Sequence, residues 1–213
     1  MGEQIEFPSN GTTAGGYLAS GEGAGLGLVV IREGGGGPHI RSVCDRLAAE
    51  GFTALAPDLQ EGKAVNVAEV GRDLSGAVDF LVDHPAVRGH GVGAIGFGLG
   101  GGLALWLAGL RPDQVQVVVP FYGALPWPDA QPDWDRIAAS VEGHYGERDD
   151  WATPAMARDI EEKLDSRGRD VRLFFYPTAG HAFFDETRPE AYDEDASRQA
   201  WVRTLEFLRA KLG

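Results

Sequence analysis

The segment VGAIGFGLGGGLALWLAG, residues 92–109, places the strongest constraint on how this chain can fold. An apolar strand pattern over 92–97 runs into five glycines between positions 96 and 102, and an apolar helix pattern follows over 101–110. A strand-to-helix turn this tight brings backbone segments close together and commonly holds a ligand or a catalytic side chain at its apex. Gly98 stands at the apex and has no side chain, so residues elsewhere must indicate what the turn does.

The rest of the chain alternates strand patterns with helix patterns. This alternation predicts an α/β fold, in which a mostly parallel central sheet carries helices on both faces. We expect one domain over residues 1–213, with ligands bound where the parallel strands end. The expected strands, some with the loop that follows, are 4–9, 13–19, 25–33, 52–58, 92–97, 114–123, 140–150 and 171–183, and the expected helices are 39–51, 67–85, 101–110, 153–168 and 193–212.

Composition and charge exclude several classes of protein. The formal net charge of −13 repels polyanions, so we expect no nucleic-acid partner. The apolar runs have strand length, and the N-terminus lacks the pattern of a signal peptide, so we expect no membrane partner. The single cysteine, Cys44, excludes an intramolecular disulfide and fits a reducing compartment. These features favour a cytoplasmic monomer or homodimer that acts on a small molecule.

Three interpretations fit the glycine turn. Gly96, Gly98 and Gly101 match the spacing of a dinucleotide-binding loop, but that loop belongs at the first strand–helix turn, and several elements precede it here. A cluster of structural glycines also fits, because glycines mark close backbone packing. The third interpretation is a nucleophile elbow, since residues 96–100 match G-x-nucleophile-x-G in everything except the central residue.

The elbow interpretation predicts the order of the other catalytic groups along the chain. An acid should follow a later strand, and a histidine should follow the last strand. Asp149 and Asp150 follow the strand pattern that contains Val141, and His181 follows the strand pattern VRLFF. Spacing alone does not choose between the two aspartates. The other two interpretations leave the placement of these residues unexplained.

Together these segments resemble the dienelactone hydrolase family, which has the α/β-hydrolase fold. The similar segments are VVIREGGGGPHIRSVCDRLAAEGFTALAPDL, IGFGLGG, HYGERDDW and AGHAFFDETRPEAYDEDASRQAWVRTLEFL. They correspond to the family's segment of strand, glutamate turn, helix and ALAPDL strand, its Gly-x-Cys-x-Gly-Gly elbow, its acid loop, and its histidine turn with the closing helix. The resemblance covers nearly the whole chain and selects Asp149 over Asp150 as the acid.

The resemblance places cysteine, or sometimes serine, where this chain has Gly98. It also implies that Glu33 is the glutamate that contacts the resting nucleophile. The backbone N–H groups of Gly34 and Leu99 fit the two positions of an oxyanion hole, which need no side chain. Cys44 lies within a helix pattern, on its apolar side, so we expect it in the core rather than in the site.

The missing nucleophile leaves several functions open. If Gly98 is a deliberate substitution, the natural protein is a cysteine or serine hydrolase of esters or lactones. If Gly98 is natural, we expect a non-covalent acid–base enzyme such as a lyase, cyclase or isomerase. Its base is then His181, held by Asp149, and Glu33 supplies a second carboxylate. A catalytically silent protein that binds a small molecule is the alternative from another class.

The expected pocket is mostly aromatic. Tyr122, Trp127, Trp151 and Phe183 are expected to line it, and the acid at position 185, where a cation would hold a substrate carboxylate, favours a neutral or aromatic substrate. No cofactor and no metal site are expected, because the histidines lack the spacing of metal ligands. His39 and His144 are expected near the mouth of the pocket, without an assigned role.

Overall fold

The computed structural model describes residues 2–59, 66–124 and 127–213 of the 213-residue chain. Its sheet has eight strands in the order β1-β2-β4-β3-β5-β6-β7-β8. The pairs β1–β2 and β2–β4 are antiparallel, and the pairs from β4 through β3 to β8 are parallel. The strands are β1 (Glu3–Ser9), β2 (Thr12–Ser20), β3 (Gly25–Ile31), β4 (Phe52–Pro57), β5 (Val87–Phe97), β6 (Val115–Phe121), β7 (Ser140–Gly146) and β8 (Val171–Tyr176).

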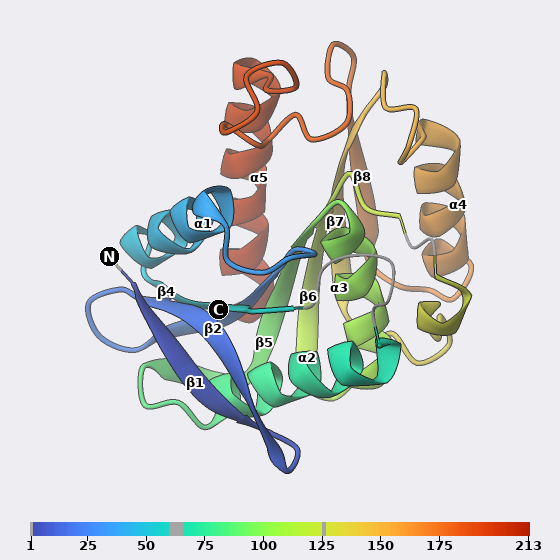
Figure 1. The fold of residues 1–213 in the computed structure, drawn as a ribbon. Coiled ribbons are helices and arrows are strands. Elements are labelled where there is room, and N and C mark those ends of the chain that lie inside the picture. Colours follow the sequence, from blue (N-terminus) through green and yellow to red (C-terminus); the bar gives the residue numbers. More distant parts are fainter. Residues whose placement is uncertain (1, 60–65, 125–126) are drawn as a thin grey trace.

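Helices cover both faces of this sheet, as the alternation of patterns predicts (Figure 1). Helices α1 and α5 pack on one face, and α2, α3 and α4 pack on the other (Figure 1). The helices are α1 (Pro38–Ala49), α2 (Val67–Val82), α3 (Leu99–Leu110), α4 (Pro154–Asp165) and α5 (Glu194–Leu212), with a short 3-10 turn, η1, at Pro128–Ala130. Within the described part of the chain, every helix is too short or too polar to serve as a membrane span.

The central strands are buried on both faces, which explains their continuous apolar runs. All seven residues of β3 are buried, and so are the last seven residues of β5. Helix α3, which follows β5, is apolar on all sides because the sheet, α2 and the loop after η1 surround it. The turn between β5 and α3 is therefore held in place by a buried strand on one side and a buried helix on the other.

Capping residues position the helices that flank the site. Thr153 accepts a hydrogen bond from the backbone N–H of Met156 at the start of α4, with Pro154 in the first helical position. Asp193 accepts one from Ala196 at the start of α5. Both caps come directly after loops that leave the carboxyl ends of β7 and β8. These loops are therefore anchored at both ends, by a strand and by a capped helix.

Candidate active site

The loops after β3, β5, β6, β7 and β8 meet at the carboxyl edge of the sheet, and the turn at Gly98 lies among them. β5 ends at Phe97 and α3 begins at Leu99, so Gly98 alone makes the turn. Gly98 has φ 58° and ψ −124°, in the left-handed region that disfavours side chains. Its N–H donates to the carbonyl of Phe121, and its carbonyl accepts from Gly101. The strand and the helix thus hold the turn in a sharp elbow.

The glycines of the turn differ in what a side chain would meet. A Cβ on Gly96 would lie 2.0 Å from the carbonyl oxygen of Gly100, and a Cβ on Gly100 would lie 2.0 Å from that of Ile31. These two residues must be glycine because backbone occupies the space. A Cβ on Gly98 would meet, among the described residues beyond its chain neighbours, only Nε2 of His181 at 3.9 Å. Close packing therefore does not require glycine at the apex, and the backbone angle is the only local reason for it.

His181 and Asp149 form a hydrogen-bonded pair beside this apex. Nδ1 of His181 lies 2.8 Å from Oδ2 of Asp149, while Oδ1 of Asp149 accepts from the N–H groups of Trp151 and Ala152. Burial raises the pKa of Asp149, but the hydrogen bond from His181 and those from the backbone outweigh burial, so the net pKa lies below its ordinary value. Asp149 is therefore a carboxylate that orients the imidazole, with Nε2 turned toward the open place above Gly98.

Two aromatic rings hold the imidazole from its sides. Trp151 meets His181 edge to face with ring centroids 4.8 Å apart, and Tyr122 does so at 5.1 Å. Tyr122 has φ 39°, an uncommon angle for a bulky residue, so the fold directs its ring with some backbone strain. Burial, and then the nearby Asp185 carboxylate, raise the pKa of Tyr122 well above its ordinary value, so its hydroxyl stays protonated. The imidazole is thus fixed between a buried ring and a half-exposed one.

A cavity of about 400 Å³ opens above the elbow. Gly98 and His181 lie in its wall, together with Tyr122 and Trp151, two of the residues that the sequence nominates for substrate binding. A volume of this size suits a small organic ligand. The residues that line it are Arg32, Glu33, His39, Phe97, Gly98, Leu99, Tyr122, Trp151, His181, Ala182, Asp185 and Arg188.

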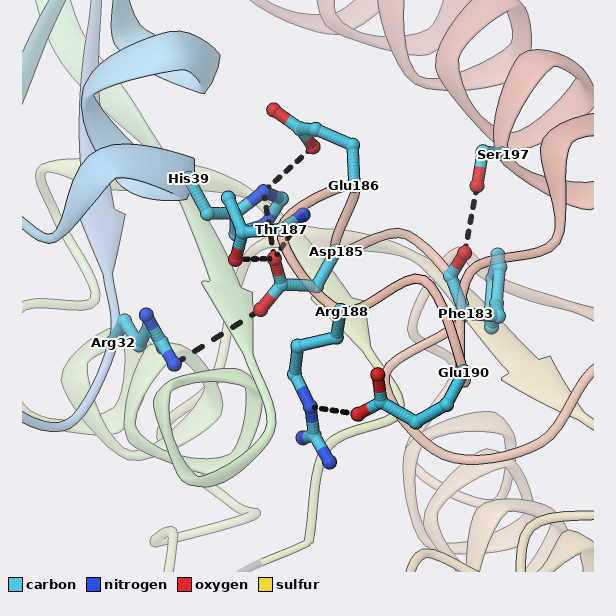
Figure 2. Close-up of polar contacts among 9 residues, drawn as sticks. All are labelled: Arg32, His39, Phe183, Asp185, Glu186, Thr187, Arg188, Glu190 and Ser197. Carbon is cyan, nitrogen blue, oxygen red and sulfur yellow. Dashed lines mark hydrogen bonds and ion pairs between the residues drawn. The ribbon is translucent and has the colours of Figure 1, made fainter.

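Charged groups occupy the side of the cavity formed by the loop after β8 (Figure 2). Asp185 is buried, and its Oδ1 accepts from the N–H and the hydroxyl of Thr187, while its Oδ2 lies 4.0 Å from the Arg32 guanidinium. Arg188 contacts Glu190 at 3.3 Å and remains half exposed. The acid at position 185 is therefore tied into its own loop, and two guanidinium groups border the same cavity.

His39 of α1 forms a second imidazole–carboxylate pair at the edge of the cavity (Figure 2). Its Nδ1 lies 2.8 Å from Oε2 of Glu186 and 3.6 Å from Oδ1 of Asp185, and the residue is 1% exposed. The ligand atoms of these three residues lie within 4.8 Å of one another, a spacing that could hold a metal ion. The hydrogen bond between His39 and Glu186 accounts for the arrangement without an ion.

The residues proposed for the oxyanion hole flank the apex in different ways. Leu99 is the first residue of α3 and lines the cavity, so its N–H has no partner within its own helix. Glu33 also lines the cavity, from the loop after β3. Gly34 has φ 78° and is exposed next to Glu33, and it is not itself in the cavity wall. The α3 N-terminus therefore supplies an N–H donor in the cavity wall.

Three residues that the sequence analysis places at the pocket or its mouth lie elsewhere in the structure. Phe183 is fully buried and packs behind Tyr122 with ring centroids 5.4 Å apart, so it supports the pocket wall instead of lining the pocket. Trp127 packs on the opposite apolar cluster, next to η1. His144 is fully buried between Tyr176 and Thr204, away from the mouth. Cys44 is buried in the core as expected, and burial raises the pKa of its thiol.

Comparisons with known proteins agree with this fold. The model of the dienelactone hydrolase family matches residues 14–69 and 60–212. This chain belongs to the dienelactone hydrolase family. Protein usf of Aquifex pyrophilus is 34% identical over 100% of both chains. A Bradyrhizobium protein provisionally named 2-oxo-3-(5-oxofuran-2-ylidene)propanoate lactonase is 31% identical over 96% of this chain and 92% of its own. The crystal structure of a Klebsiella pneumoniae protein provisionally named dienelactone hydrolase has a TM-score of 0.84 and 25% identity over 97% of each chain.

As a member of the dienelactone hydrolase family, the protein is a hydrolase with the α/β-hydrolase fold.

The sequence analysis did not identify two charged residues of the cavity, Arg32 and Arg188. A signal for Arg32 was present, because it directly precedes Glu33 at a strand end. Arg188 lies seven residues after His181, and only the turn of the loop after β8 brings it back to the cavity.

Proposed function

We propose that this protein hydrolyses a lactone or ester without forming a covalent intermediate. His181, oriented by Asp149, acts as the general base on a water molecule held in the open place above Gly98. The substrate carbonyl lies toward the N-terminus of α3, where the N–H of Leu99 stabilises the developing oxyanion. Gly98 takes no chemical part, and its missing side chain leaves room for the water.

The reaction balances with these groups alone. The water oxygen bonds to the carbonyl carbon, and Nε2 of His181 accepts the proton that the water loses. The carbonyl π electrons move to the oxygen, giving a tetrahedral oxyanion. When the carbonyl re-forms, the bond to the leaving oxygen breaks, and that oxygen takes the proton from His181. The products are a carboxylic acid and an alcohol, or a ring-opened hydroxy acid from a lactone.

One observation carries the proposal: Nε2 of His181 lies 3.9 Å from where a Cβ on Gly98 would stand, while Nδ1 is paired with Asp149. The imidazole is thus directed at the open place next to the N-terminus of α3. Hydrolases that lack their whole triad retain about 10³–10⁴-fold acceleration over water through binding and the oxyanion hole. A positioned base adds typically about 10²–10⁴-fold to such a site.

Two guanidinium groups in the cavity wall favour a substrate that carries a carboxylate, although the wall also holds the carboxylates of Glu33 and Asp185. Arg32 and Arg188 border the cavity, and the acid that suggested a neutral substrate, Asp185, is held by Thr187 and faces Arg32. Guanidinium groups bind carboxylates through paired, charge-assisted hydrogen bonds. The name of the Bradyrhizobium relative describes a lactone with a propanoate group, which has this chemistry. We therefore propose a small lactone or ester with one carboxylate.

A second candidate is proton transfer without hydrolysis, in a lyase, cyclase or isomerase. The observation that favours it is the second imidazole–carboxylate pair, His39 with Glu186, in the same cavity wall as His181. Two acid–base groups around one ligand suit the removal of a proton at one atom and its return at another. The product distinguishes the two candidates, because only hydrolysis incorporates oxygen from water.

The test is turnover of a panel of lactones and aryl esters in ¹⁸O-water. We expect one ¹⁸O in the acid product, no acyl adduct on the intact protein by mass, and a fall of kcat/KM of about 10²–10⁴-fold in His181→Asn. His90→Asn, at an exposed histidine on β5, is the matched control and should keep the activity. Binding of these compounds without turnover would favour the silent binding protein and overturn the proposal. Turnover without ¹⁸O would favour the second candidate.

A further inference from the structure

We infer that the open place above Gly98 accepts the nucleophile as a second substrate, so that the enzyme transfers an acyl group to a small primary thiol. This inference rests on the proposed function, because it uses the same imidazole and the same oxyanion donor. It goes beyond hydrolysis in naming a further reaction and the chemical class of the acceptor.

The shape of the open place supports an acceptor larger than water. The group missing from the apex, relative to a cysteine or serine, is one methylene and one heteroatom. A Cβ there would meet, among the described residues beyond its chain neighbours, only His181 Nε2 at 3.9 Å. The –CH₂–SH end of a free thiol has the same atoms and can occupy the same place, with its sulfur next to Nε2.

The elbow around this place is preserved although it carries no side chain. Gly98 keeps φ 58° and ψ −124° because its N–H donates to Phe121 and its carbonyl accepts from Gly101. The cavity of about 400 Å³ is also large enough for a small acyl donor and a thiol of a few heavy atoms together. The acceptor therefore meets the same surroundings that a nucleophile on the chain would meet.

The electrostatics of the site favour a thiol over an alcohol. A thiol has a pKa near 8.5, far below that of water or an alcohol, so a neutral imidazole removes its proton far more readily. The N-terminus of α3 carries partial positive charge and lies directly behind the apex, which stabilises a thiolate. Thiolates are also strong nucleophiles toward carbonyl carbon.

The transfer step balances without any further reactant. Nε2 of His181 accepts the thiol proton as the sulfur bonds to the carbonyl carbon of the ester. The C–O bond of the tetrahedral oxyanion then breaks, and the leaving oxygen takes the proton back from His181 or departs as a phenolate. The products are a thioester and an alcohol, and nothing is oxidised or reduced.

The experiment uses the whole protein with 4-nitrophenyl acetate and increasing 2-mercaptoethanol, and it measures thioester and acid by chromatography after subtraction of the reaction without enzyme. We expect thioester formation to saturate with thiol and to exceed hydrolysis on the order of 10-fold, because a thiolate is the better nucleophile. His181→Asn should abolish this saturable product.

Variants at the apex give a second readout, the ratio of thioester to acid. Gly98→Ala fills the place of the thiol methylene, so the ratio should fall at least about tenfold, since misplacing a reactant by 1 Å costs up to 10²-fold. Gly168→Ala is the matched control, because Gly168 also has a positive φ, 67°, with nothing within 4 Å of an added Cβ, and lies outside the cavity. Gly98→Cys should form an acyl-enzyme and lose the saturation by free thiol.

The outcomes separate the two proposals. Suppose that hydrolysis depends on His181, but that thioester rises only linearly with thiol or persists unchanged in Gly98→Ala. Either result would overturn this inference and leave the proposed function standing. The absence of any turnover that depends on His181, with or without thiol and across the panel of esters, would overturn both.

Discussion

Oδ2 of Asp149 lies 2.8 Å from Nδ1 of His181, although 32 residues separate them in the chain. The neighbouring Asp150 is exposed, whereas the side chain of Asp149 is fully buried. One of two adjacent carboxylates thus orients the imidazole, because the loop after β7 turns Asp149 inward and Asp150 outward.

This pair predicts unequal effects of two matched substitutions. Asp149→Asn should lower kcat/KM for the preferred lactone or ester by about 10²–10⁴-fold, because an amide no longer stabilises the imidazolium or the correct tautomer. Asp150→Asn, one residue away, should change it less than about twofold, since an exposed carboxylate is screened by water. Steady-state kinetics with both variants checks this, and equal effects would contradict the assignment of the acid.

The guanidinium groups predict a charge preference among substrates. Arg188→Gln and Arg32→Gln should each raise KM for a lactone that carries a carboxylate by about tenfold, equivalent to roughly 1.4 kcal/mol. The KM of the same lactone as its methyl ester should change little. Arg198→Gln, at an exposed arginine of α5 paired with Asp195, is the control. If KM rises equally for the charged and the neutral compound, the arginines do not bind the carboxylate.

The crowding around the elbow predicts that Gly100, one of its two enclosed glycines, cannot be replaced without a large loss of stability. Gly100→Ala should lower the free energy of unfolding by about 3 kcal/mol or more, because its Cβ would lie 2.0 Å from the carbonyl oxygen of Ile31, on a backbone that cannot move aside. Gly168→Ala carries only the strain of a positive φ and should cost about 1–2 kcal/mol. Urea denaturation compares the two variants, and a smaller loss for Gly100→Ala would show that the turn can relax.

The buried His144 predicts a dependence of stability on pH. Burial lowers the pKa of His144, and the Glu142 carboxylate 3.5 Å away does not fully offset this. The unfolded chain therefore binds a proton below about pH 6.5, whereas the folded chain resists it until the pH is lower. Stability is full above about pH 6.5 and falls as the pH drops below that value, toward the folded pKa.

The measurement is urea unfolding of the protein and of His144→Gln, at about pH 5 and about pH 7.5. Glutamine retains a donor and an acceptor for Tyr176 and Thr204, and it does not titrate. The variant should lose less stability than the parent between the two pH values. The pKa of Asp149 is also lowered, but this carboxyl changes the free energy of unfolding only below about pH 4, outside the pH range compared here. A parallel loss in both proteins would exclude His144 as the cause.

The order of elements, and the convergence of His181 with an acid from the loop after β7, could be predicted from the residues. The run GLGLVVI is apolar at every position, which indicates a strand buried on both faces, and β3 is such a strand. His181 follows the last strand, and the carboxyl ends of parallel strands share one edge of the sheet. Chain order within such a fold therefore brings an acid and a histidine to the elbow.

Boundaries were less predictable, because packing overrides local preference. Helix α3 begins at Leu99 and not at residue 101, since close contact with β3 and β6 holds Gly100 and Gly101 in helical geometry despite their low propensity. β5 begins at Val87 and not at residue 92, because Val87 pairs with Gly25 at the start of β3. Both differences arise from partners that lie far away in the chain.

The sequence alone predicts the fold class and the convergence of a histidine and an acid at the glycine turn, because periodicity and chain order carry that information. The choice of Asp149 over Asp150 depends on the resemblance to the family. The sequence also shows that the apex lacks a nucleophile. Only the three-dimensional packing decides that Phe183 lies behind the pocket wall, that Arg32 and Arg188 reach the cavity, and that the place above Gly98 is open toward His181. The physical reason is that a periodic pattern specifies which face a side chain takes, whereas its depth and its neighbours depend on how distant loops fold back upon one another.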